Sequence, residues 1–194
     1  MAEIRSTLDM VMERAARMAA RAEDVPADQE TEQRGMRLVV DFLAGKTASL
    51  TELLEQETAS EQMTVRRGMA KVLIRNIVLP RDEVLMAGSL TAISGLLELG
   101  GPASAMNTLC TELKQILEQY SQHKEQIKQQ LEDAMRAQLS QKLQEQGMTA
   151  EQTAIDPTMH PRFREEWARA QSDLNAQYTQ AIDQRKEILQ QRFS

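Results

Sequence analysis

The sequence predicts an all-α protein, in which a helical bundle core is followed by a long antiparallel, coiled-coil-like helical hairpin built from the C-terminal half. Two observations carry this prediction. The 194 residues include 8 Gly, 5 Pro and 3% aromatic residues, too few turn-forming and strand-forming residues for a many-stranded fold. Between the breakers, apolar residues recur every three or four positions, as they do on one face of a helix.

We expect two domains along the chain. Residues 1–101 form the helical core, and residues 102–194 form the hairpin, with its crossover near residues 147–161 and its base packed on the core. Hydrophobic residues make up 41% of the chain, which is below the usual share for a compact globule. A small core with a polar extension fits this composition better than one large globule.

The first expected helix, residues 4–25, carries a heptad seam. Its apolar positions advance in alternating steps of four and three residues: Ile4, Leu8, Val11, Ala15, Met18, Ala22 and Val25. An isolated helix of this length is marginally stable in water, so its seam has to be buried. We therefore expect the seam to pack on the base of the hairpin or on its copy in another chain.

The next two helices are marked by their caps. One is expected to end at Gly45, which suits a left-handed C-terminal cap. The other is expected to begin at Ser49, whose hydroxyl forms a capping-box pattern with Glu52. This third helix runs towards Pro80, with or without a break near Ser60.

The most apolar stretch, residues 84–99, predicts the central helix of the core. Asp82 is a suitable N-cap, and apolar residues wrap most of the circumference, as expected of a helix buried on several sides. The stretch is too short for a membrane span, so we expect none. Gly100 and Gly101 end this helix.

The two arms of the hairpin are residues 102–146 and 161–193. At ~1.5 Å per residue they reach roughly 65 Å and roughly 50 Å, so their crossover lies far from the core. The expected seam of the outgoing arm is Leu109, Leu113, Ile116, Tyr120, His123 and Ile127. The expected stripe of the return arm is Phe163, Trp167, Ala170, Leu174, Tyr178, Ile182, Arg185 and Leu189.

No complete catalytic, cofactor-binding or metal-binding motif occurs in the sequence, so we expect no enzyme activity, no cofactor and no metal. Gly45-Lys46-Thr47 resembles the end of a phosphate-binding loop, but Val40 occupies the position of the first glycine of that motif. The two histidines are far apart. We interpret His123 as a polar seam residue and His160 as a solvent-facing loop residue. Cys110 has no companion histidine nearby and indicates an inert, buried thiol.

The net charge of −6 is spread along the chain without a basic block, so we expect no nucleic-acid partner. A single cysteine excludes an intrachain disulfide framework and is consistent with the cytosol. Charged residues in the first turns interrupt the apolar run that a signal peptide needs. We expect a cytoplasmic protein.

Three segments carry a resemblance to known proteins: Glu3-Ile4-Arg5-Ser6-Thr7-Leu8, the junction Leu79-Pro80-Arg81-Asp82, and the crossover from residue 147 to residue 167 with its Asp156-Pro157 pair. In these segments the chain is similar to a group of uncharacterised bacterial, cytoplasmic, all-helical proteins. The resemblance spans most of the chain. It implies an all-helical fold and assigns no activity and no site.

The leading hypothesis for function is a non-enzymatic helical scaffold or adaptor that binds a protein partner or forms a homo-oligomer. The alternative is a chaperone-like or regulatory binder that holds an apolar peptide or small ligand in a Met-lined groove of the first hundred residues. The candidate interaction surface is the crossover, at Ile155, Met159, His160, Phe163 and Trp167. The competing interpretation is that its apolar residues pack on one another to close the end of the hairpin.

Overall fold

The computed structural model describes residues 27–101, 104–145 and 156–194. Its elements, in chain order, are α2 (Ala27–Leu43), α3 (Leu50–Glu55), α4 (Gln62–Asn76), α5 (Glu83–Gly100), α6 (Ser104–Glu145), the short 3-10 helix η2 (Pro157–Met159) and α7 (Pro161–Phe193). No strand occurs within these three described ranges, which confirms the all-α class. The expected first helix, residues 4–25, lies outside them.

The chain divides into two compact units, and the boundary after Val72 falls inside α4. The described part of the first unit contains α2, α3 and most of α4. The second unit contains the end of α4 and everything that follows it. The division expected from the sequence, at residue 101, stays a prediction about which parts fold independently.

The caps of the first unit follow their local sequence. Gly45 has a positive φ of 71°, so it adopts the left-handed conformation expected of it. The Ser49 hydroxyl accepts a hydrogen bond from the backbone N–H of Glu52 at 3.2 Å, which confirms the N-cap of α3. A break does separate α3 from α4, and there the Thr58 hydroxyl donates to Glu61 at 2.8 Å.

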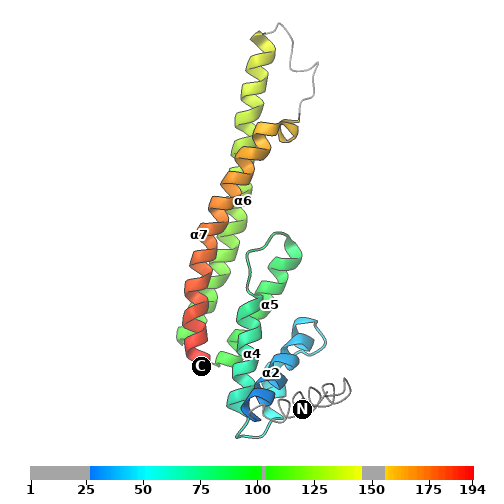
Figure 1. Ribbon diagram of the computed structural model, residues 1–194, viewed down its shortest axis with the longest axis vertical. Coiled ribbons are helices and arrows are strands. Elements are labelled where there is room, and N and C mark those ends of the chain that lie inside the picture. Colours follow the sequence, from blue (N-terminus) through cyan, green and yellow to red (C-terminus); the bar gives the residue numbers. More distant parts are fainter. Residues whose placement is uncertain (1–26, 102–103, 146–155) are drawn as a thin grey trace, which may run out of the picture. The chain divides into compact units, whose positions relative to one another are not determined.

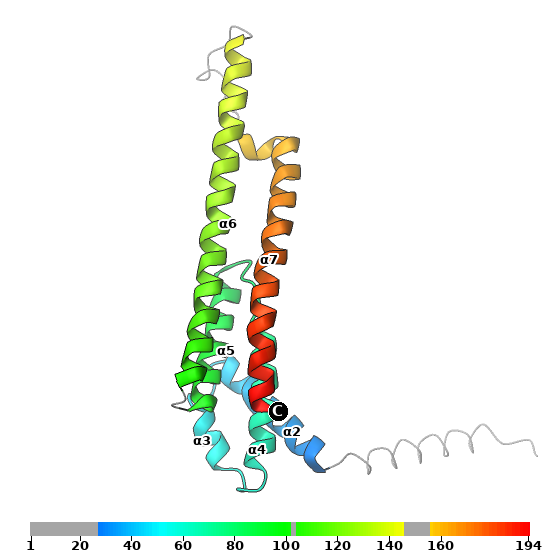
Figure 2. The ribbon, with the colours of Figure 1, turned by 90° about the vertical axis from the view of Figure 1, so that its left-hand side faces the viewer.

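The second unit is organised around the hairpin of α6 and α7, which lie side by side and run in opposite directions (Figures 1 and 2). Three contacts between side chains set its register, and the two that lie further along α6 than Glu112 pair with residues that lie earlier in α7 than Arg185. They are Glu112–Arg185 at 3.2 Å, Tyr120–Asn175 at 2.8 Å and His123–Tyr178 at 2.6 Å. The predicted antiparallel hairpin is therefore confirmed.

The buried face of α6 differs in detail from the expected seam. Leu117 is fully buried, whereas Ile116, which the heptad pattern placed in the seam, is half-buried. The reason is that α5 and α7 both pack on α6, so the buried arc of this helix is wider than a single seam. The buried residues of α6 are Met106, Leu109, Cys110, Leu113, Leu117, Tyr120 and Met135.

Helix α5 begins at the predicted cap, where Asp82 accepts a hydrogen bond from the N–H of Leu85 at 2.9 Å. Among the described helices, α5 is long and apolar enough to cross a membrane by length and composition alone. A core helix of a soluble protein meets the same criterion, and Ile93 and Leu96 of α5 are fully buried. Length therefore does not exclude a span here, and the expectation that there is none stays a prediction.

Candidate functional site

The distal end of the hairpin holds four of the five residues that the sequence analysis selected. Met159 ends η2, His160 follows it, and Phe163 and Trp167 lie in the first two turns of α7. Ile155 lies outside the described residues. Figures 1 and 2 show η2 beside α6 at the start of α7, with α6 continuing past this level.

The backbone of η2 is fixed by a local set of hydrogen bonds. The Asp156 carboxylate accepts from the N–H of Thr158 at 2.9 Å and from its hydroxyl at 2.7 Å. The N–H of Met159 donates to the carbonyl of Asp156 at 3.1 Å. The Thr158 side chain and backbone, and the nearby Arg136 guanidinium, lower the pKa of Asp156 because each favours its charged form. The turn is therefore well defined even though most of it is exposed.

His160 is the N-cap of α7, which corrects its interpretation as a solvent-facing loop residue. Its Nδ1 accepts a hydrogen bond from the N–H of Arg162 at 3.2 Å, and the residue is half-buried. Pro161 explains the position of this cap, because proline is favoured at the first position of a helix and not further in. With Nδ1 accepting, the imidazole proton belongs on Nε2.

The turn is attached to the hairpin by apolar residues. Pro157 is buried, Phe163 is only 4% exposed, and η2 contacts both α6 and α7. The register of the hairpin brings Met135 of α6, which is also buried, level with Phe163. Phe163 therefore supports the end of the hairpin from inside and contributes little to its outer surface.

Met159, in contrast to the buried Phe163, is directed towards solvent, and 71% of its surface is exposed. The Arg164 guanidinium donates to the carbonyl of Met159 at 3.3 Å, which places a positive charge beside the backbone of this residue. His160, Arg164 and the half-buried Trp167 are spaced by four and three residues, so they share one face of α7. We call Met159, His160, Arg164 and Trp167 the distal surface.

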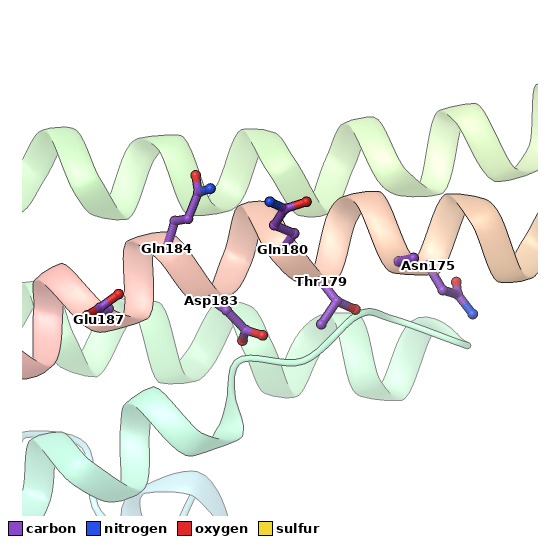
Figure 3. Close-up of a pocket in the computed structure, with 7 residues that line it drawn as sticks. Asn175, Thr179, Gln180, Asp183, Gln184 and Glu187 are labelled. Carbon is purple, nitrogen blue, oxygen red and sulfur yellow. The ribbon is translucent and has the colours of Figure 1, made fainter.

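A second feature is an open depression of about 590 Å³ along α7. The residues that line it are Asn175, Ala176, Thr179, Gln180, Asp183, Gln184 and Glu187, which form no apolar cluster of large side chains. Figure 3 shows Thr179 and Asp183 pointing to one side of the helix and Gln180 and Gln184 to the other, so they do not converge on one point. Within the part of the chain that the structure describes, no group of three or more His, Cys, Asp or Glu residues could hold a metal ion.

The middle of the hairpin contains a polar aromatic cluster with a structural role. The hydroxyl of the buried Tyr120 donates to Asn175, and the Tyr178 hydroxyl hydrogen-bonds to Nδ1 of His123. The rings of Tyr120 and Tyr178 meet edge to face with centroids 5.4 Å apart. His123 is exposed, yet it contacts the opposite helix as a polar seam residue should. Hydrogen bonds and edge-to-face ring contacts depend on direction, so they favour this alignment of α6 with α7 over shifted alignments.

The other residues that the sequence singled out, Cys110 and the methionines of the first hundred residues, are not part of the distal surface. Burial raises the pKa of the Cys110 thiol to about 11, although the charge of Lys114 opposes this shift. Such a thiol is protonated at neutral pH and is not a nucleophile. Of the methionines in the first hundred residues, Met69 is fully buried and Met63 is 69% exposed. The Met-lined groove stays a prediction.

The comparison with protein families gives one match. The model of a family of unknown function, DUF6657, matches residues 51–191, well over half of the chain. The chain belongs to this family. No curated protein and no solved structure matches it.

The DUF6657 match includes most of α3, all of α4, α5 and α6, and α7 to its last turn. It therefore contains the whole hairpin and the distal surface, and it leaves out α2. The family is one of unknown function, so the match assigns no activity to the hairpin.

Proposed function

We propose that this DUF6657 protein is a non-enzymatic, cytoplasmic helical scaffold or adaptor, whose hairpin presents the distal surface to a protein partner or to a second copy of the chain. The single observation that carries the proposal is the position of Met159. This large apolar side chain is 71% exposed at the end of a hairpin whose turn is fixed by hydrogen bonds.

A fixed turn favours binding, because an already ordered backbone loses little conformational entropy when a partner docks. Burial of one methionine side chain contributes about 1.5–3 kcal/mol. Methionine also adapts its shape to irregular partners, since it is unbranched and has three rotatable bonds. Met159 therefore has the properties of an apolar anchor.

The apolar residues at the distal end differ in how deeply they are buried. Phe163 and Pro157 are buried, while Met159 is exposed and Trp167 is half-buried. A turn that only closed the hairpin would be expected to bury its largest apolar side chains. Phe163 follows that expectation and Met159 does not.

The proposal is tested by comparing proteins captured from native cells by the tagged wild-type chain and by two variants. Met159→Ser removes the anchor, and Met63→Ser removes an equally exposed methionine from α4. We expect a specific partner, or an untagged copy of the chain, to be captured by the wild type and by Met63→Ser, and to be lost from Met159→Ser without a change in melting temperature. Equal capture by all three chains would contradict the proposal.

A further inference from the structure

We propose that the distal surface binds an acidic amphipathic peptide segment, with a carboxylate at Arg164 and His160 and a neighbouring apolar side chain on Met159 and Trp167. This inference rests on the proposed function and adds the chemistry of the partner. It rests on which polar groups at the end of the hairpin have hydrogen-bond or ion-pair partners among the described residues and which do not.

Three acidic groups near this surface have partners among the described residues. The Asp156 carboxylate accepts two hydrogen bonds from Thr158. Glu166 pairs with Arg162 at 2.7 Å, in an i to i+4 pair along α7. On α6, Asp133 pairs with Arg136 at 2.8 Å. The two ion pairs offset charge locally, and the two hydrogen bonds from Thr158 occupy one oxygen of Asp156.

Arg164 differs from these neighbours. Its contact in the described part of the chain is with the carbonyl of Met159, which satisfies one N–H and leaves the positive charge without a carboxylate there. Glu165 follows directly in sequence but lies ~100° away around the helix. A guanidinium with its remaining donors free is suited to bind a carboxylate with two parallel hydrogen bonds.

His160 adds a second donor on the same face. Because its Nδ1 accepts from the N–H of Arg162, its proton is on Nε2 and is available to an acceptor from outside. The distal surface thus offers two donors beside one exposed apolar side chain. A carboxylate next to a leucine-like side chain complements this arrangement, whereas a lysine-rich segment would meet Arg164 with like charge.

The net charge of the whole chain is −6, so the overall field does not steer an acidic partner towards it. Recognition therefore depends on the short-range contact with Arg164. Such a contact is charge-assisted and partly screened by salt, so the affinity should fall moderately as the ionic strength rises.

The test uses the full-length chain and short synthetic peptides. Trp167 is the single tryptophan of the sequence and belongs to the surface, so its fluorescence reports binding there. One peptide intersperses leucine with glutamate, a second intersperses leucine with lysine, and a third intersperses serine with glutamate. We expect saturable changes in fluorescence with the leucine–glutamate peptide and weak or absent changes with the other two.

Two variants locate the contact. Arg164→Gln should weaken binding of the leucine–glutamate peptide by about tenfold or more, because it removes the charge-assisted pair of hydrogen bonds to the carboxylate. Arg169→Gln changes an exposed arginine five residues further along α7 and should leave the affinity unchanged. Circular dichroism of each variant verifies that the helix content is retained.

Three outcomes would overturn the inference. They are equal binding of the leucine–lysine peptide, unchanged affinity in Arg164→Gln, and no binding of the leucine–glutamate peptide at millimolar concentration. None of them decides the proposed function, because a partner of different chemistry would still be captured through Met159. The capture experiment with Met159→Ser and Met63→Ser tests that function separately.

Discussion

Gly35 of α2 and Gly68 of α4 lie at the crossing of their two helices, and each packs directly on a backbone carbonyl of the other. A Cβ atom on Gly35 would overlap the carbonyl oxygen of Val65, and one on Gly68 would overlap that of Glu32. Each glycine lies three residues after the carbonyl that the other glycine contacts. The two contacts are therefore reciprocal, and they bring the helix backbones closer than any larger residue permits.

This crossing predicts that alanine is not tolerated at either glycine. Gly35→Ala and Gly68→Ala should each reduce the free energy of unfolding by about 1–3 kcal/mol, the usual cost of overpacking, because both obstacles are backbone atoms. Thermal melting followed by circular dichroism measures the effect. Gly88→Ala is the matched control, since space around Gly88 is open and alanine favours helix. Equal melting temperatures for all three variants would contradict the close crossing.

The contact between Tyr120 and Asn175 predicts a coupled pair within the hairpin. Tyr120→Phe should cost about 1 kcal/mol, because it removes one hydrogen bond from a ring that is 1% exposed. In a double-mutant cycle with Asn175→Ala, the two changes should cost less together than the sum of their separate effects. Strictly additive effects on the free energy of unfolding would show that the hydrogen bond does not contribute.

We predict that the thiol of Cys110 reacts slowly in the folded protein. Because burial raises its pKa to about 11, the native thiol should react with a disulfide reagent at neutral pH far more slowly than the same thiol in denaturant. The absorbance of the released thiolate follows the reaction. Equally rapid labelling of the native chain would mean that this part of α6 is open to solvent.

We predict that the turn held by Asp156 is destabilised by acid. Its pKa is lowered below the ordinary value of 3.8, first by the hydrogen bond from the Thr158 side chain. A carboxylate with a lowered folded-state pKa stabilises the fold fully above its ordinary pKa, and this contribution is lost as the pH falls through the lower, folded value. The amide signal of Thr158 in nuclear magnetic resonance spectra should therefore shift below pH 3.8. Asp156→Asn should abolish this transition, and a midpoint above 3.8 would contradict the assigned contacts.

Features set by neighbouring residues in the chain were predictable from the sequence. The left-handed Gly45, the capping by Ser49 and Asp82, and the stripe of α7 all depend on local chemistry and helical spacing. The break between α3 and α4 involves a contact between side chains, the hydrogen bond from the Thr58 hydroxyl to the Glu61 carboxylate, so helical spacing alone allows this segment with or without a break.

Features set by packing were not predictable. The burial of Leu117 depends on where α5 and α7 meet α6, and the roles of Gly35 and Gly68 depend on a crossing that helix propensity does not show. Histidine is not among the preferred N-cap residues, so the sequence alone does not predict that His160 caps α7. Arg164 carried no signal beyond its place one turn after His160, although it reaches the carbonyl of Met159.

The measurement that tests the central claim most directly is cross-linking from position 159 in living cells. A photoreactive amino acid replaces Met159 in one chain and Met63 in another, because the two methionines are similarly exposed. We expect one discrete cross-linked protein from position 159, either a different chain or a second copy of this one, and no such product from position 63. Absence of a discrete product from position 159, or the same product from both positions, would contradict a contact surface at the end of the hairpin.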